Sequence, residues 1–408
     1  YIISGRENGE YTNPYQLTEN WLQQHDIAYD KLILTNAYQP LEKAKICVDN
    51  GITLMIDDTR KVYRDVEKAG INVLLMDTPY NREAIGYNRV QNWKNIYEYI
   101  RQLQTKKEHI ILDTDLYNEI DDQFALTYLM KSLDKFELDA ITIAPFSKSG
   151  YANTMTIEEG TQKSFDTTIH LLKLLHREEY IKKVFKGATS YFKESQEENE
   201  AVNQMIEISL KNEKTTILAI GAITNIALAI TKEPKIVDRI KVVWLGGNSF
   251  LTKNNDEFNF RQDIQAVQTV FESQVKLVVI PCRNVASHLA TTIYELQHYL
   301  QEDTKLNHYL LEIFEKCKKS FMKVPEDAIG SSKTLWDLSA IAYAINQDWF
   351  QCELLSCPKV LESGLYEPTT DRHPIVFVND LSRNKIYQDF FIKMNTPMLK
   401  EEKNEINK

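Results

Sequence analysis

The sequence predicts an α/β protein in which a mostly parallel, Rossmann-like sheet is preceded by a smaller α/β segment. Short apolar runs typical of buried strands alternate with longer stretches of helical periodicity along most of the chain. Acidic and amide side chains follow several of these runs, as expected at the carboxyl edge of a parallel sheet, where ligands bind. A polar stretch at 102–108 separates the two parts, so we assign domains to 1–105 and 106–398 and a charged tail to 399–408.

Composition narrows the class of protein. The 408 residues are 43% hydrophobic and 26% charged, as in a soluble globular protein with two or more domains. A net charge of -10 argues against nucleic acid or an anionic membrane as a partner. The chain has no apolar run long enough to cross a bilayer, and its first residues do not form a signal peptide. Five scattered cysteines without a CxxC pair indicate reduced thiols in a cytoplasm. The sequence does not decide whether the protein forms a homo-oligomer.

The first 105 residues alternate predicted strands with predicted helices. The strands are 1–4, 31–35, 52–58 and 71–78, and the helices are 16–25, 41–50 and 92–103. Polar residues lie at or just after strand ends, or before the third strand: Ser4, Lys43, Asp57 and Asp58. Carboxylates in such places indicate Mg²⁺ or phosphate chemistry, although acids spread in this way are often ordinary loop residues.

This segment resembles the haloacid-dehalogenase-like phosphatases, most closely the 5′(3′)-deoxyribonucleotidase branch. The resemblance covers nearly all of residues 1–100 and rests on ISGR, WLQQHDIAYDKLILT, KAKICVDNGITLMIDD and DTPYNR. It implies that Ser4 and Lys43 bind phosphate and that Asp57 and Asp58 hold Mg²⁺. The nucleophile of that family lies in a DxD motif upstream of ISGR, which this sequence does not include. We therefore expect either part of a longer protein or a segment with a structural or regulatory role.

Residues 109–130, HIILDTDLYNEIDDQFALTYLM, form the chemically most distinctive stretch. A buried strand is followed by five acids in ten residues and then by a buried helix. Those acids are Asp113, Asp115, Glu119, Asp121 and Asp122. Clustered carboxylates repel one another unless a cation lies among them, and oxygen ligands suit Ca²⁺ or Mg²⁺ better than zinc. The alternative is a helix cap with solvated loop acids.

Downstream, the pattern of strand and helix continues. Strands are predicted at 138–146, 215–221, 241–247 and 275–282, and helices at 157–175, 264–272, 292–301 and 307–319. Asn248 follows two glycines at a strand end, where backbone can approach a ligand closely. Glu257 and Asn259 face one side if their segment is extended, so together they can chelate sugar hydroxyls. Asp337 stands at the start of an apolar helix, where the simpler alternative is a cap.

Residues 109–390 resemble the inosine/uridine-preferring nucleoside hydrolases. The motifs are DTDLYNEIDDQFAL, ILAIGAITNIALAI, VVWLGGN, DEFNFRQDIQAVQTVFES and LWDLSAIAYAI, in the same order. The resemblance implies one Ca²⁺ on a Rossmann-like sheet and cleavage of the N-glycosidic bond of a ribonucleoside. It assigns Asp115 as general base, and it assigns metal ligation or support to Asp113, Asp115, Asn118, Asp122, Asp337 and the backbone carbonyl of Thr224. The ribose hydroxyls fall to Asp121, Asn248, Glu257 and Asn259.

The sequence departs from that family in three places, which concern the metal loop, the ribose-binding amide and the residue that assists the leaving base. The metal loop is two residues longer than the usual DTDPGxDD, which adds Asn118 and Glu119 beside the metal. The loop before EFNF is shorter, so the ribose-binding amide expected there is Asn254 or Asn255. Trp336 replaces a histidine that commonly assists the leaving base. The candidates to stack on the base are Trp336, Tyr117, Phe250 and Trp244, and the alternative for each is a place in the core. His288 is then our candidate acid, with His373 as the other.

The resulting functional prediction is calcium-dependent hydrolysis of ribonucleosides to free base and ribose in nucleotide salvage. One alternative is phosphatase activity of the N-terminal part in a longer protein. Another is a non-catalytic nucleoside or pentose binder that retains the metal and ribose sites. A nucleotidase forms nucleosides and a nucleoside hydrolase consumes them, so the two resemblances predict consecutive steps.

Overall fold

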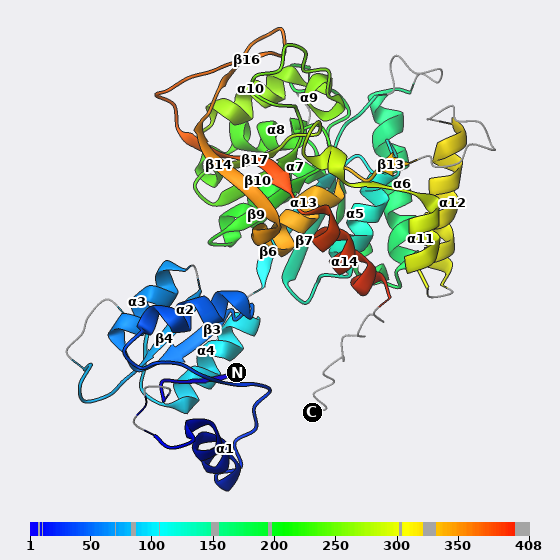
Figure 1. Cartoon of the computed structure of the whole chain (residues 1–408). Helices are drawn as coiled ribbons and strands as arrows, with labels where there is room; N and C mark the ends of the chain where they lie inside the picture. The colour runs from blue at the N-terminus through cyan, green and yellow to red at the C-terminus, as the bar shows by residue number, and fades with distance from the viewer. Residues whose placement is uncertain are drawn as a thin grey trace, which may run out of the picture. The chain divides into compact units, whose positions relative to one another are not determined.

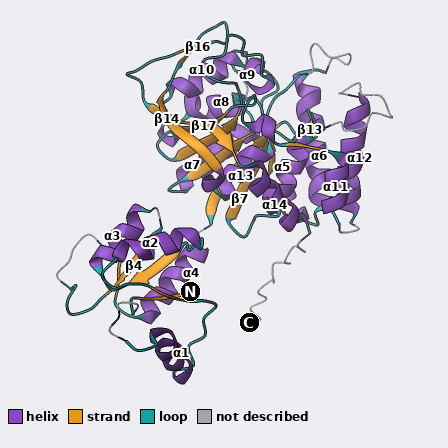
Figure 2. Cartoon of the chain, in the orientation of Figure 1, coloured by secondary structure: helices purple, strands orange, loops and turns teal. Residues whose placement is uncertain are grey.

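The computed structural model describes residues 1–6, 9, 11–69, 71–82, 87–105, 107–147, 155–194, 198–301, 304–320 and 332–395. The chain divides into two compact units, Tyr1–Lys106 and Lys107–Lys408 (Figure 1). The charged tail predicted at 399–408 lies outside the described residues. Each unit combines strands with helices, as Figure 2 shows.

The first unit contains two small parallel sheets, β1–β2 and β3–β4–β5. Its strands are β1 (Ile2–Ser4), β2 (Leu32–Leu34), β3 (Leu54–Asp57), β4 (Asn72–Met76) and β5 (Arg89–Val90). Its helices are α1 (Pro14–Gln24), α2 (Pro40–Asp49), α3 (Arg60–Lys68) and α4 (Trp93–Thr105). The sequence patterns did not predict α3, because only Val62, Tyr63 and Val66 in this charged stretch face the core. The four predicted strands and three predicted helices are present.

The second unit is built on an eight-stranded sheet with the order β14-β17-β11-β10-β9-β6-β7-β8. Its strands are β6 (Glu108–Thr114), β7 (Phe136–Ile143), β8 (Val184–Lys186), β9 (Thr215–Ala219), β10 (Ile240–Leu245), β11 (Lys276–Ile280), β14 (Phe350–Ser356) and β17 (Pro374–Leu381). Neighbouring strands are parallel except β14, which pairs antiparallel with β17. The mostly parallel sheet expected from the buried apolar runs is therefore confirmed, and the antiparallel edge is an addition.

Helices cover both faces of this sheet. Consecutive residues of β10 point to opposite faces of the sheet, since Val243 packs into one apolar cluster and Trp244 into the other. The first cluster contains residues of α5 (Asp121–Met130), α6 (Ile157–Leu174), α11 (Ile293–Tyr299), α12 (Lys305–Ser320), α13 (Leu338–Ile345) and α14 (Arg383–Met394). The second contains residues of α7 (Glu200–Lys211), α8 (Thr224–Lys232), α9 (Phe258–Gln262) and α10 (Ile264–Glu272). Figure 1 shows α5, α6, α11 and α12 on one side of the sheet and α8 and α10 on the other.

Short elements complete the second unit. They are the strand pairs β12 (Ala290–Thr291) with β13 (Lys333–Thr334) and β15 (Lys359–Val360) with β16 (Tyr366–Glu367), and the 3₁₀ turns η1 (Glu178–Lys183), η2 (Pro234–Ile236), η3 (Ala286–His288) and η4 (Gln347–Trp349). In the part of the chain that the structure describes, no helix combines the length and apolarity needed to cross a membrane. All five cysteines are free thiols.

Candidate active site

Four adjacent strands of the large sheet end at the same edge. β11, β10, β9 and β6 are parallel neighbours, so the residues that follow them converge there. Asp115 follows β6, Gly221 follows β9, Asn248 follows β10, and Arg283 follows β11. Ligand sites of open α/β sheets lie at this edge, and here it opens into a polar cavity.

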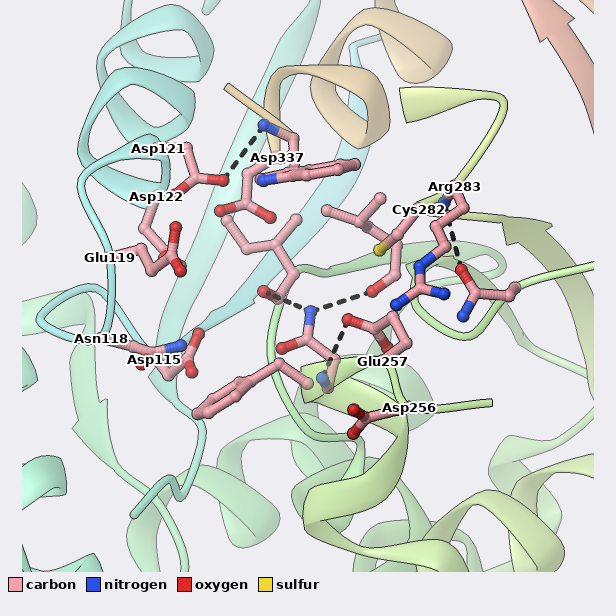
Figure 3. A pocket seen from close by; sticks show the side chains of 16 residues that line it. Asp115, Asn118, Glu119, Asp121, Asp122, Asp256, Glu257, Cys282, Arg283 and Asp337 are labelled. Carbon is pink, nitrogen blue, oxygen red and sulfur yellow. Dashed lines mark hydrogen bonds between the residues drawn. The ribbon is translucent and has the colours of Figure 1, made fainter. Parts of the chain in front are cut away.

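The cavity has a volume of about 230 Å³, which suits a small molecule. Figure 3 shows acidic residues on two sides of the cavity, with Asp115, Glu119, Asp121 and Asp122, together with the amide Asn118, on one side and Asp256 and Glu257 on the other. The lining also includes Ile220, Leu245, Asn248, Phe258, Asn259, Cys282, Arg283, Trp336 and Asp337.

The densest group of carboxylates is Asp121, Asp122 and Asp337. One oxygen from each lies within 4.8 Å of the others, and all three residues are buried. Asp121 and Asp122 open α5, and Asp337 immediately precedes α13. None of the three caps its helix through a side-chain hydrogen bond, so the alternative of a simple helix cap does not account for Asp337 or for the acids of α5.

Burial opposes the ionisation of this group. It raises the pKa of Asp122 to about 8, with the charge of Asp121 as the next cause. The pKa of Asp121 rises to about 6, again through burial, while the positive charge of Lys333 limits the rise. The pKa of Asp337 lies well above its usual range because of burial and then the neighbouring carboxylates. Two carboxylates about 4 Å apart repel by roughly 4 kcal/mol at an effective dielectric of about 20, so a cation would stabilise the group.

Asp115 lies beside this group with an unsatisfied oxygen. Its Oδ2 is buried without a hydrogen-bond partner in the described residues, as is Oδ1 of Asp121. Burial and then the charge of Asp122 place the pKa of Asp115 well above its usual range. Gly221 leaves room for it, since a Cβ there would come within 3.1 Å of Oδ1 of Asp115. Orphaned carboxylate oxygens in an all-oxygen set fit a hard cation such as Ca²⁺.

Asp113 and Thr224, two further predicted metal residues, do not line the cavity. Oδ1 of Asp113 accepts hydrogen bonds from Thr142 at 2.7 Å and from Asn225 at 2.9 Å. Burial raises the pKa of Asp113 to about 7, although these two bonds favour its charged form. The hydroxyl of Thr224 donates to Asp263 at 2.7 Å. Both side chains therefore tie neighbouring elements together behind the site, and the roles predicted for Asp113 and for the backbone carbonyl of Thr224 stay predictions.

Lys333 supplies a positive charge that the sequence analysis missed. It forms a short ion pair with Glu119, and its side chain is only 12% exposed. Burial alone would lower the pKa of Lys333, but the charges of Asp121 and Glu119 outweigh burial and raise it. The partners are 214 residues apart, so no local pattern could reveal the pair.

Glu257 and Asn259 both reach the cavity, but not from an extended segment as predicted. Glu257 caps α9, where its carboxylate accepts hydrogen bonds from the backbone N–H of Gly247 at 2.8 Å, Asn259 at 3.0 Å and Phe260 at 2.9 Å. Glu257 caps the helix because its two carboxylate oxygens accept from backbone amides at the start of α9 that have no partner within the helix. The Nδ2 group of Asn259 donates hydrogen bonds to the backbone carbonyls of Ile220 and Leu245, so its Oδ1 faces away from these two carbonyls.

The predicted proton donors lie outside the cavity lining. His288 is half-exposed and its Nδ1 lies 3.4 Å from a carboxylate oxygen of Asp380. His373 follows β16 in the loop before β17, and burial lowers its pKa. His288 lies in the turn η3 and His373 lies in the loop before β17, and neither contributes to the cavity lining, so their role as acid stays a prediction. Trp336 does line the cavity, and its backbone N–H donates to Asp121.

The two amides proposed for the shortened loop also lie away from the lining. Asn254 is exposed, and the buried Asn255 donates to the carbonyl of Gly364 at 3.2 Å. Asn248 does line the cavity, as do the amides Asn118 and Asn259. The sequence analysis also missed Phe258 and Arg283, whose positions depend on the turns after β10 and β11.

In the first unit, two of the four predicted phosphatase residues are in contact. Lys43 Nζ lies 2.7 Å from Oδ2 of Asp57. The carboxylate of Asp58 instead accepts a hydrogen bond from the hydroxyl of Tyr80, and its backbone carbonyl accepts one from Nδ2 of Asn81 at 2.8 Å. Ser4 ends β1, in the other small sheet, and its carbonyl accepts from Thr35.

Comparison with known families agrees with this architecture. The sequence model of the inosine-uridine preferring nucleoside hydrolases matches residues 110–378. The chain belongs to this family. A second model, the cytosolic type C 5′ nucleotidases specific for deoxy (pyrimidine) nucleotides, matches residues 2–108. Both resemblances drawn from the sequence motifs are confirmed.

Individual relatives cover parts of the chain. The inosine-uridine preferring nucleoside hydrolase of Crithidia fasciculata is 31% identical over 168 residues, which span 39% of this chain and 52% of that protein. A nucleotidase of Clostridium acetobutylicum is 32% identical over 96 residues, 23% of this chain and 48% of that protein. The chain thus spans about half the length of these curated relatives.

Solved structures support the fold of the second unit. A purine-preferring ribonucleoside hydrolase from Gardnerella vaginalis superposes with a TM-score of 0.57 at 20% identity, covering 70% of this chain and 98% of that one. The Rossmann-like nucleoside hydrolase architecture expected from the sequence is therefore confirmed.

Proposed function

We propose that this nucleoside hydrolase family member cleaves the N-glycosidic bond of ribonucleosides and requires Ca²⁺ to do so. The observation that carries the proposal is the buried trio Asp121, Asp122 and Asp337 beside the orphaned Oδ2 of Asp115. An all-carboxylate set of this kind has little reason to form in a protein interior without a cation.

The cation would be held by Asp115, Asp121, Asp122 and Asp337, with Asn118 on the adjacent loop. A bound Ca²⁺ would supply Lewis acidity, which polarises an attacking water and the vicinal hydroxyls of ribose. Asp115 then serves as the general base, because it lines the cavity, its Oδ2 has no hydrogen-bond partner among the described residues, and its pKa is raised. Asn248, Glu257 and Asn259 line the part of the cavity that remains for the sugar.

No histidine lines the cavity among the described residues, so the proton donor of other family members has no direct equivalent there. Trp336 offers an aromatic face on which the ring of the base can stack. This mode of activation depends on the aromatic ring of the base, and it does not require a histidine at the position of Trp336.

The absence of a histidine at that position favours the second candidate, a non-catalytic nucleoside binder. The decisive experiment is a screen of ribonucleosides for released base with and without Ca²⁺. Release that depends on Ca²⁺ supports the hydrolase. Binding of nucleosides without release supports the binder.

A role in nucleotide salvage fits the two family matches, and the free thiols fit a reducing cytoplasm. We further propose that the nucleotidase-like unit and the hydrolase unit act on consecutive intermediates of nucleotide breakdown. Lys43 paired with Asp57 is a candidate phosphate and Mg²⁺ site for the phosphatase step. Phosphate and base release measured from one monophosphate substrate would test this order.

A further inference from the structure

Arg283 is the one cation among the residues that line the cavity in the described part of the chain. Figure 3 shows it with Glu257 and Asp256 on the side opposite Glu119, Asp121 and Asp122. Its guanidinium makes no hydrogen bond or ion pair with any residue that the structure describes. Its backbone N–H, by contrast, is anchored on Oδ1 of Asn248 at 3.1 Å.

The neighbouring acids do not neutralise this guanidinium. Asp256 pairs with Arg261 at 3.1 Å. The carboxylate of Glu257 is taken up by three backbone amides. The positive charge of Arg283 is therefore available to a ligand in the cavity.

Asn248 supplies a second donor at the same place. It is 2% exposed, and its Nδ2 is buried without a partner among the described residues. Its Oδ1 is occupied by Arg283, which fixes the amide so that Nδ2 remains the free group. A buried amide donor without a hydrogen-bond partner is destabilising, so a ligand that offers an acceptor to Nδ2 gains binding free energy there.

The two donors lie across the cavity from the carboxylate cluster. If the vicinal hydroxyls of ribose face the cluster, the ring substituents at C1′ and C4′ point away from it. Trp336, next to Asp337 in the chain, offers its ring to the base at C1′. The guanidinium of Arg283 and the amide of Asn248 then face the substituent that C5′ carries. A guanidinium and an amide together match a phosphate better than a hydroxyl, because a phosphate offers negative charge and several acceptor oxygens.

We propose that Arg283 and Asn248 form a subsite for a 5′-phosphate, so that nucleoside 5′-monophosphates are substrates of this site. The inference rests on the proposed hydrolase function and names its substrate class. In the reaction, the C1′–N bond breaks, a C1′–O bond to water forms, and the base leaves with a proton. The products are the free base and ribose 5-phosphate.

The first test compares kcat/KM for inosine and uridine with that for their 5′-monophosphates in Ca²⁺, and identifies the sugar product by mass spectrometry. We expect the wild type to favour the monophosphates by roughly tenfold or more, with ribose 5-phosphate as the product. Arg283→Gln should lower that preference by roughly tenfold, and Arg283→Lys by less, because a lysine cannot make two parallel bonds. Arg239→Gln is the control, since Arg239 precedes β10 at the opposite edge of the sheet.

A wild type without preference for the monophosphate overturns the proposal. The proposal is also overturned if Arg283→Gln lowers kcat/KM for nucleosides and for their 5′-monophosphates by the same factor, because Arg283 then contacts the base or the ribose. Appearance of the free nucleoside before the free base also contradicts it, since the phosphate was then removed before the glycosidic bond broke.

A second test does not depend on hydrolysis. Calorimetric titration in Ca²⁺ should show ribose 5-phosphate binding roughly tenfold more tightly than ribose to the wild type, but not to Arg283→Gln. Equal affinities while nucleosides are hydrolysed would remove the phosphate subsite alone. Tighter binding of ribose 5-phosphate without hydrolysis of any substrate would remove the proposed reaction and leave the subsite standing.

Discussion

The backbone N–H of Trp336 donates to Oδ2 of Asp121 at 3.1 Å, across 215 residues of sequence. This bond joins the start of α13 to the start of α5, so it brings Asp337 beside Asp121 and Asp122. The positive ends of both helices point at the same group of carboxylates, which favours their charged forms. Burial and mutual repulsion outweigh that benefit, as the raised pKa values of Asp121 and Asp122 show.

Calcium should stabilise the protein through this group. At a free concentration about 100 times Kd, a cation that binds only the folded state adds roughly 2.7 kcal/mol to the free energy of unfolding. Asp337→Asn should remove most of this gain and should raise the stability of the metal-free protein, because it removes one repelling charge. Melting temperatures with Ca²⁺ and with a chelator would measure both effects. The exposed Asp238 provides a control, as Asp238→Asn should change neither. A wild type that Ca²⁺ does not stabilise would refute the site.

Calcium affinity should fall as pH falls from about 8.5 to 6. The pKa values of Asp121 and Asp122 are raised to about 6 and about 8, so protons compete with the cation across this range. For a carboxyl group raised in this way, the metal-free folded protein gains stability as pH falls, because the unfolded chain ionises more readily. Calorimetric titrations at several pH values would show the trend. An affinity independent of pH would contradict it.

Asp115→Asn should reduce base release by at least roughly a hundredfold at saturating Ca²⁺, because an amide cannot accept the proton from water. Loss of a general base should appear in kcat, measured by release of free base. Circular dichroism should show an intact fold, since the isosteric amide also relieves repulsion in a buried group. A rate close to that of the wild type would remove Asp115 from the mechanism.

Lys333→Met should destabilise the protein, because it leaves Glu119 and Asp121 without their positive neighbour. Adding Glu119→Gln should recover part of the loss. The coupling free energy of the pair, from denaturant unfolding of both single variants and the double variant, should be on the order of 0.5–3 kcal/mol. Additive effects of the two substitutions would show that the ion pair does not hold the loop.

Trp336→Ala should lower kcat/KM for nucleosides by roughly tenfold, whereas Trp336→Phe should retain most of the activity, because the ring supplies the stacking surface. Steady-state kinetics on one purine and one pyrimidine nucleoside would measure the loss. Equal activity of the alanine and phenylalanine variants would exclude stacking as the activation of the leaving base.

Local patterns were sufficient for much of the fold and for part of the site. Strands and helices of the large unit followed from runs and periods of apolar residues, since each pattern reports which faces are buried. The acids at 113–122 predicted a cation site with oxygen ligands, because five carboxylates in ten residues are costly without a cation. Asp115, Asp121, Asp122 and Asn118 all line the cavity as that stretch indicated.

Other assignments required the folded chain. Glu257 was expected on an extended segment but caps α9, because the free amides of a helix start outweigh alternation of side chains. His288 was a candidate acid, yet it faces Asp380 outside the cavity. The pair of Lys333 with Glu119 and the free guanidinium of Arg283 depend on elements far apart in sequence.

The sequence by itself therefore determined the class of fold and the stretch in which the acids cluster, because periodicity and residue type act over a few neighbouring positions. Only the tertiary structure decided which of the acids lie together in the cavity and which donors face them. That selection follows from the strand order β11-β10-β9-β6 and from the bond between Trp336 and Asp121. Strand order depends on how remote apolar faces pack against one another, and this information is not contained in any single stretch of the chain.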